Sequence, residues 1–313
     1  MKKSGKMAVF LVSGFLGAGK TTLISHLLAS RIEGLGKMAI IVNEVGEIGI
    51  DGTLLSGHDV DMVEITSGCI CCTMKGDFSR ALKEIHDRVA PDFLIVETTG
   101  VAQPGDILDL FIAPPVDEYA RIRSLVTVIS SEMFKAREVF GPFYDNQIRY
   151  ADKLILNKAD LVSPESLEEI KASLHQMNPE AFVFPAQYCA VDPSLLFRGD
   201  SPVPKAQKRG HSEPVHLDEW GFQTFSFEDS RPMHRERLNE FLKSLPPTLF
   251  RLKGWVRFPD GSALLDFSGG RFRIAPIDDS RSTAFTFVGR NCNKTQILDA
   301  LKQCRMDKTS AEK

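Results

Sequence analysis

A glycine-rich segment near the start of the chain has the spacing of a phosphate-binding loop. Residues 14–21 read Gly-Phe-Leu-Gly-Ala-Gly-Lys-Thr and fit G-x-x-x-x-G-K-[ST] between an expected strand and an expected helix. Glycines let backbone N–H groups point at phosphates, and the helix adds the positive end of its dipole. Lys20 would reach the β- and γ-phosphates, and the Thr21 hydroxyl would bind Mg²⁺. We therefore expect nucleotide contacts from Gly14, Gly17, Ala18, Gly19, Lys20, Thr21 and Thr22.

A carboxylate stands at the end of the apolar run 93–96. Glu97 is followed by Thr-Thr and then by Gly100. In a P-loop fold, an acid at this strand end lies beneath the Mg²⁺, usually through a water; it is most often Asp, and here it is Glu. Gly100 follows where a backbone N–H would sense the γ-phosphate. We expect Lys20, Thr21 and Glu97 to act in the phosphate chemistry, with Glu44 as a further catalytic candidate.

The tetrapeptide 157–160, Asn-Lys-Ala-Asp, follows the apolar run 153–156 and fits N-K-x-D. The Asp160 carboxylate would accept hydrogen bonds from the ring N–H and the exocyclic amino group of guanine, whereas adenine lacks both donors. Sites built on such pairing discriminate by ~10⁴-fold or more. The stem of Lys158 would cover the base, and Asn157 would tie the loop. The pattern favours GTP over ATP, and residues 186–188 are candidates for a backbone contact to the base.

Three of the six cysteines are crowded into positions 69–72, in the sequence Gly-Cys-Ile-Cys-Cys that begins at residue 68. In an extended chain Cys72 would point away from Cys69 and Cys71, so a bend must bring the three together. Three thiolates suit Zn²⁺ or Cu⁺ and leave one coordination position for a water or a client residue. Buried structural cysteines and a redox role are the alternatives. The scattered cysteines are expected to be packing residues: Cys189, Cys292 and Cys304.

Residues 43–52, Asn-Glu-Val-Gly-Glu-Ile-Gly-Ile-Asp-Gly, lie between the expected first helix and the cysteines. The three glycines predict a mobile segment. Its carboxylates, from Glu44, Glu47 and Asp51, would come near the phosphates or the metal. We expect Asp51 to join Thr21 and Glu97 in the Mg²⁺ site. A solvated acidic loop is the alternative.

The overall composition is that of a globular protein. The 313 residues are 43% hydrophobic and 25% charged, with a net charge of −3. This balance argues against a general nucleic-acid binder, and no apolar run approaches the ~18 residues of a membrane span. Lysines followed by the apolar stretch 7–18 resemble a signal peptide. Because the stretch continues directly into Gly-Lys-Thr-Thr and a helical pattern, we expect a cytoplasmic protein with reduced thiols.

Short apolar runs alternate with helical periods over residues 1–198. The helical faces lie within 23–28, 78–89 and 167–174. This alternation predicts an α/β fold, with a mainly parallel P-loop GTPase sheet and helices on both faces. Strands are expected at 7–13, 38–42, 60–65, 93–96, 124–129, 153–156 and 182–184.

A polar stretch rich in Pro and Gly, residues 199–218, indicates a linker. Its His211 and His216 flank Glu213, and a solvated linker is favoured there over a metal site. The remainder predicts a smaller C-terminal α+β domain at 219–305 and a tail at 306–313. Its strands are expected at 221–227, 249–258, 263–267, 271–274 and 284–288, and its helices at 233–245 and 294–304.

Together these motifs resemble those of the CobW-type metallochaperone GTPases, the class that contains CobW, UreG and HypB. The resemblance rests on GFLGAGKTT, NEVGEIGIDG, GCICC, ETTG and NKAD in the family's order. It continues into the second domain at 220–222, 250–255 and 287–290. The chain departs from the family at Val45, where Phe is usual, and at Ser130 and Ser131, where many members have Asp-Ala. The linker also lacks a long His-rich run.

The resemblance implies GTP hydrolysis coupled to delivery of a transition metal to a client metalloprotein. Zinc would be the metal, with Co²⁺ or Ni²⁺ as alternatives, bound by Cys69, Cys71 and Cys72 with Glu47 as a helper. The protein would be a monomer, or a homodimer that depends on nucleotide or metal. A metal-responsive regulator that binds a partner without transferring metal is the alternative function. A P-loop kinase would have no use for N-K-x-D or for the cysteines.

Overall fold

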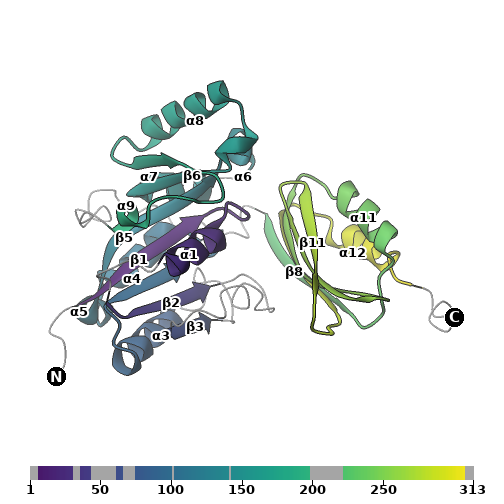
Figure 1. Cartoon of the computed structure of the whole chain (residues 1–313), viewed down its shortest axis with the longest axis horizontal. Helices are drawn as coiled ribbons and strands as arrows, with labels where there is room; N and C mark the ends of the chain where they lie inside the picture. The colour runs from purple at the N-terminus through teal and green to yellow at the C-terminus, as the bar shows by residue number, and fades with distance from the viewer. Residues whose placement is uncertain are drawn as a thin grey trace. The chain divides into compact units, whose positions relative to one another are not determined.

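The computed structural model describes residues 6–30, 36–43, 61–65, 75–100, 102–140, 142–197 and 221–306 (Figure 1). The chain forms two compact units, and the described residues of the first run from 6 to 197 and those of the second from 221 to 306. The expected linker, 199–218, and residues 307–313 of the expected tail lie outside the described residues.

The first unit is built on a seven-stranded sheet in the order β3-β2-β4-β1-β5-β6-β7, and every neighbouring pair is parallel. Its middle strands contain consecutive buried apolar residues; Leu154, Ile155 and Leu156 of β6 are completely buried. Burial of successive residues means that both faces of the sheet are covered. The strands are β1 Met7–Gly14, β2 Met38–Asn43, β3 Asp61–Ile65, β4 Phe93–Glu97, β5 Ala120–Ser130, β6 Lys153–Asn157 and β7 Phe182–Pro185.

Helices cover this sheet, and α1 and α9 share a buried cluster with Val12, Ile95 and Ile155 of the strands. Helices α4 and α7 also pack on β5. The α/β prediction with a mainly parallel sheet is thus confirmed. The helical elements are α1 Lys20–Ala29, α3 Lys75–Arg88, α4 Pro104–Phe111, α5 Val116–Tyr119, η1 Ser131–Ala136, α6 Arg137–Phe140, α7 Pro142–Tyr150, η2 Ala159–Leu161, α8 Pro164–Met177 and α9 Pro193–Phe197.

The sequence pattern located the seven strands to within a few residues but did not assign the helices between residues 104 and 150. These helices are short, and prolines stand at 104, 114, 115 and 142, where they start or separate them. Elements of four to nine residues give too few turns for a helical period to emerge. No helix in the described part of the chain is long and apolar enough to cross a membrane.

The second unit is a five-stranded antiparallel sheet with two helices. The strand order is β11-β10-β9-β12-β8. This arrangement confirms the predicted C-terminal α+β class. The elements are β8 Phe222–Asp229, α11 Arg235–Ser244, β9 Leu249–Phe258, β10 Gly261–Ser268, β11 Arg271–Ile277, β12 Thr283–Arg290 and α12 Lys294–Lys302.

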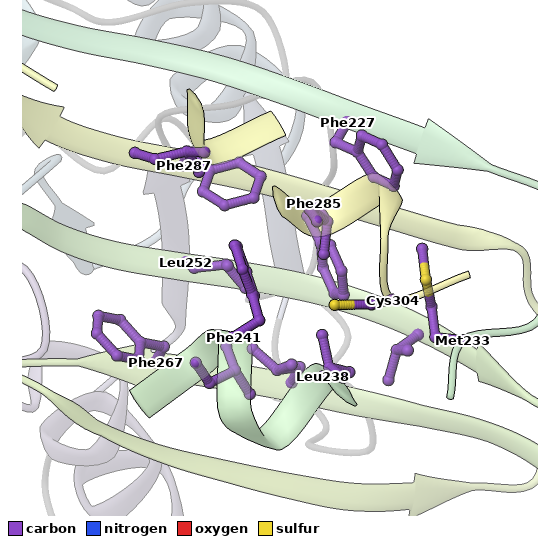
Figure 2. Close-up of a cluster of buried hydrophobic side chains, with 14 of the residues drawn as sticks. Phe227, Met233, Leu238, Phe241, Leu252, Phe267, Phe285, Phe287 and Cys304 are labelled. Carbon is purple, nitrogen blue, oxygen red and sulfur yellow. The ribbon is translucent and has the colours of Figure 1, made fainter. Parts of the chain in front are cut away.

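Aromatic side chains dominate the core of the second unit (Figure 2). Phe225 and Phe287 stack with ring centroids 4.8 Å apart and planes 6° from parallel. Cys292 and Cys304 are buried in the same core, as free thiols, which confirms their packing role. Burial raises the pKa of the Cys304 thiol to about 11.

Candidate functional site

The loop between β1 and α1 winds tightly through left-handed backbone conformations. β1 ends at Gly14 and α1 begins at Lys20. Gly17 has a φ of 72°, and Gly19, which precedes the helix, has a φ of 117°. Only glycine adopts such values without strain. The loop therefore delivers the chain to the N-terminus of α1, where unpaired helix N–H groups favour an anion.

Gly19 has a second reason to lack a side chain. A Cβ at this position would lie 2.5 Å from Nδ2 of Asn157 and 3.0 Å from Sγ of Cys189. These neighbours come from the ends of two other strands, so the glycine-rich loop and the Asn-Lys-Ala-Asp segment are in direct contact. The two motifs that the sequence places 136 residues apart, from Thr21 to Asn157, form one site.

Lys20 points back into its own loop. Its Nζ donates hydrogen bonds to the carbonyl oxygens of Gly14, at 2.9 Å, and Phe15, at 3.4 Å, and the side chain is 9% exposed. These acceptors hold the ammonium group at the centre of the loop. From there it can exchange carbonyl oxygens for phosphate oxygens.

Thr21 and Glu97 bring two oxygen ligands together. The Thr21 hydroxyl donates to Oε1 of Glu97 at 3.3 Å, and Glu97 is buried at the end of β4. A hydroxyl and a carboxylate beside a phosphate-binding loop are ligands that Mg²⁺ prefers. The donor set therefore fits the ion. When bound, Mg²⁺ would neutralise charge on the phosphates.

Gly100 lies directly against the glycine-rich loop. A Cβ on Gly100 would be 2.7 Å from the backbone N of Leu16 and 2.6 Å from its side chain. The segment that leads to it is anchored, because Thr98 N–H donates to Val12 O at 2.9 Å and Ala102 N–H donates to Thr99 O at 3.0 Å. Gly100 is thus held against the glycine-rich loop.

Asn157 joins three segments with one side chain. Its Nδ2 donates to the Ala18 carbonyl at 2.8 Å, and its Oδ1 accepts from the Cys189 N–H at 2.8 Å. The Ser131 hydroxyl donates to its backbone carbonyl at 2.8 Å. The expected tying role of Asn157 is therefore a bridge from the phosphate loop to the loop that follows β7.

Lys158 and Asp160 differ in how they are held. Lys158 has a φ of 59°, and its Nζ forms an ion pair with Oε1 of Glu132 at 2.7 Å, which fixes the long side chain. Asp160 is exposed, and among the described residues its carboxylate takes part in no hydrogen bond or ion pair. The arrangement leaves the carboxylate accessible to donors of a base.

The loop after β7 contributes two features. Ala186 donates its N–H to Leu156 O at 2.9 Å, so this N–H is already used, and Gln187 and Tyr188 are the exposed members of the trio. The Cys189 thiol donates to Gly19 O at 3.3 Å, and burial raises its pKa to about 12. The packing role expected for Cys189 is confirmed.

Sequence reasoning missed the partners that orient these motifs. It did not place the Cys189 thiol on the glycine-rich loop, Glu132 on Lys158, or Ser131 under Asn157. These residues occur outside any motif. The one sequence signal in this region was the departure from the family's Asp-Ala at 130–131, which includes Ser131.

Several expected site residues lie outside the described residues. They belong to the acidic segment and the cysteine cluster: Glu44, Glu47, Asp51, Cys69, Cys71 and Cys72. His211 and His216 of the expected linker also lie outside the described residues. Within the described ranges, no group of three or more His, Cys, Asp or Glu residues is arranged to hold a metal ion.

Known proteins are similar to all or to part of this chain. The "Zinc chaperone CobW" of Pseudomonas aeruginosa is 28% identical over 96% of this chain and 92% of its own length. The "Zinc chaperone YeiR" of Escherichia coli is 33% identical over 59% of this chain and 57% of its own. A solved structure of zinc-bound YjiA GTPase from E. coli is 20% identical, with a TM-score of 0.47, over 96% of this chain and 100% of that one.

Two family models match the chain in sequence order. Residues 222–305 match the cobalamin synthesis protein CobW C-terminal domain. Residues 8–185, more than half of the chain, match the CobW/HypB/UreG nucleotide-binding domain. The resemblance stated from the motifs is therefore confirmed, and the chain belongs to the CobW/HypB/UreG family of P-loop GTPases.

Proposed function

We propose that this GTPase is a metallochaperone that binds zinc at Cys69, Cys71 and Cys72 and couples GTP hydrolysis to delivery of the metal to a client protein. Glu47 would assist the thiolates, and Co²⁺ or Ni²⁺ are the alternative cargoes. Two of the similar proteins carry the name zinc chaperone. Binding by thiolates requires reduced cysteines, which the cytoplasm maintains.

The observation that carries the nucleotide part is the bridge made by Asn157. It sets the exposed carboxylate of Asp160 at a fixed place relative to the phosphate loop through its bonds to Ala18 O and Cys189 N. A guanine nucleotide would then present its base to Asp160 and its phosphates to Lys20. Lys158 would cover the base with its aliphatic stem.

The proposed chemistry needs little more than positioning and charge. Lys20 would stabilise negative charge on the β- and γ-phosphates, and the N–H of Gly100 would face the γ-phosphate. Thr21 and Glu97 would hold Mg²⁺ together with Asp51, and Glu44 would be the further catalytic residue. The remaining N–H groups of residues 14–22 would surround the phosphates.

The connectivity of the described elements supports a coupling between nucleotide and metal. The cysteine segment joins β3, which ends at Ile65, to α3, which begins at Lys75. β3 and β4 are both parallel to β2 in one sheet, so the carboxyl ends of β3 and β4 face the same edge. A structural change caused by loss of the γ-phosphate beside Gly100 would therefore be passed on to the cysteine segment.

A titration tests this proposal. We expect zinc to bind more tightly to the protein loaded with a non-hydrolysable GTP analogue than to the protein loaded with GDP. Linkage then requires zinc to increase the affinity for the analogue, relative to GDP, by the same factor. A coupling of ~1–3 kcal/mol is typical. Binding should release protons and strengthen from pH 6 to 8, because the thiols must lose their protons. A variant with Cys69, Cys71 and Cys72 all changed to Ser is the control. Equal zinc affinity in this variant and in the wild type would show that the three cysteines are not the zinc site.

A metal-responsive regulator that binds a partner without handing over zinc is the second candidate function. Transfer separates the two: zinc-loaded protein is mixed with a fluorescent zinc chelator, with GTP or with the analogue. Faster transfer with GTP supports delivery. Equal rates together with a partner captured only in one nucleotide state would favour regulation.

A further inference from the structure

Helix α7 contacts the phosphate loop through aromatic rings. The ring centroid of Phe15, inside the loop, lies 5.9 Å from that of Phe143 and 5.8 Å, edge to face, from that of Tyr144. The ring centroid of Phe140, at the end of α6, lies 4.2 Å from that of Phe15. All four side chains are buried, so α7 and the phosphate loop are packed as one body.

The same helix is also hydrogen-bonded to the segment that follows β4. Gln147 of α7 is 1% exposed, and its Nε2 donates to Gly100 O at 3.1 Å and to Ala102 O at 3.2 Å. The neighbouring Asn146 donates from Nδ2 to Oε1 of Gln103 at 3.1 Å. Two adjacent amide side chains therefore hold Gly100, Ala102 and Gln103.

Gln147 is itself fixed by the sheet. The Thr127 hydroxyl, on β5, donates to the backbone carbonyl of Gln147 at 2.9 Å. The backbone from which the amide side chain extends is thus tied to β5. A single NH₂ group satisfies two buried carbonyls that would otherwise have no partner among the described residues.

These bonds orient the backbone N–H of Gly100. Thr99 O accepts from Ala102 N–H, and Gly100 O accepts from Gln147, so the carbonyl groups of Thr99 and Gly100 are both engaged. In the described part of the chain the N–H of Gly100 makes no hydrogen bond, and Gly100 touches Leu16 of the phosphate loop. The donor is left for a ligand in that loop.

We propose that Gln147 is a positioning residue for GTP hydrolysis, which holds Gly100 against the phosphate loop so that its N–H is ready for the γ-phosphate. The inference rests on the proposed place of the γ-phosphate beside Gly100. Because GDP lacks that group, the contribution of Gln147 is specific to the triphosphate. Helix α7 links the position of Gly100 to that of Phe15.

The test compares Gln147→Met with Asn178→Leu. Methionine keeps the length of the side chain and removes both donors. Asn178 is a matched control, because it is fully buried and its Nδ2 donates to the carbonyls of Ile148, Arg149 and Ala151 just beyond Gln147. Affinities for fluorescent GDP and for a fluorescent non-hydrolysable GTP analogue are measured with kcat and KM for GTP.

We expect Gln147→Met to lower kcat and the analogue affinity by roughly tenfold, the effect of losing two neutral hydrogen bonds. GDP affinity should change less than about twofold, because GDP does not use Gly100. Asn178→Leu should keep the wild-type ratio of analogue affinity to GDP affinity. The proposal is overturned if Gln147→Met also keeps this wild-type ratio, or if Asn178→Leu lowers it as much as Gln147→Met does.

Two further variants keep the result interpretable. Asn146→Ala removes the milder contact to Gln103 and should shift the ratio in the same direction; if Gln147→Met does not fold, an unchanged ratio in Asn146→Ala overturns the proposal. Lys20→Ala tests the nucleotide site itself. If Lys20→Ala still hydrolyses GTP, the proposed phosphate site is wrong. If Lys20→Ala loses hydrolysis but Gln147→Met keeps the wild-type ratio of analogue affinity to GDP affinity, only the role of Gln147 is rejected.

Discussion

Replacing Asn157 with Ala removes two buried hydrogen bonds at once. The bonds, to Ala18 O and from Cys189 N–H, are each 2.8 Å long, and Asn157 is 3% exposed. A buried group left without its partner costs about 1–3 kcal/mol. Two such groups predict a loss of roughly 2–6 kcal/mol in the free energy of unfolding. Since domains are stable by only about 5–15 kcal/mol, the variant should fold but unfold at markedly lower denaturant.

Asp160→Ala provides the contrast within the same motif. Asp160 is exposed and makes no hydrogen bond or ion pair within the described ranges, so its loss should change the free energy of unfolding by less than about 0.5 kcal/mol. Guanine binding should nevertheless fall by orders of magnitude, because the base would lose both of its charged hydrogen bonds. Asn157→Ala should lower stability and binding together.

The assay must report on the first unit. Both tryptophans, Trp220 and Trp255, lie beyond residue 197, so intrinsic fluorescence would follow the other unit. We would follow urea unfolding by hydrogen–deuterium exchange of peptides from residues 6–197, which separates the first unit from the second, and binding with a fluorescent GDP and unlabelled GTP or ATP as competitors. A wild-type unfolding curve for Asn157→Ala, or equal destabilisation in Asp160→Ala, would refute the reasoning. ATP competing as well as GTP in the wild type would refute the assignment of the base.

Two further predictions follow from single side chains. Lys20→Ala should abolish GTP hydrolysis, measured as phosphate release, because no other described cation hydrogen-bonds within the loop; unchanged turnover would contradict the phosphate assignment. Burial raises the pKa of Cys189 from 9.0 to about 12, so the folded state keeps a proton that the unfolded state loses. Its contribution to stability is complete below pH 9 and falls as the pH rises from 9 towards 12. Urea midpoints across this range should fall more steeply for the wild type than for Cys189→Ser, and parallel curves would exclude the effect.

The strands and motifs were predictable because their signals are local. Apolar runs marked β1 and β6 before the glycine-rich loop and before Asn157. A parallel sheet brings the carboxyl ends of its strands to one edge, and this explains why Gly19 lies beside Asn157 in the structure. The burial of Cys189, Cys292 and Cys304 followed from their isolation in sequence.

The contacts that orient the site were not predictable in the same way. Gln147 reaches Gly100 across 47 positions, and Glu132 reaches Lys158 across 26. Neither Gln nor Glu stands out in an amphipathic or interrupted helical stretch. Such pairs depend on how β5, η1 and α7 pack, which is a tertiary property that periodicity does not encode.

The burial of the described cysteines has a consequence for the handling of metal. Cys189, Cys292 and Cys304 are all covered, and the raised pKa values of Cys189 and Cys304 keep their thiols protonated at neutral pH. A covered, protonated thiol is a poor competitor for a thiophilic ion. If the chain carries zinc as proposed, the thiols of Cys189 and Cys304 will not compete for the cargo in transit. Among the six cysteines of the chain, those at 69–72 would then be the ones that bind the ion tightly.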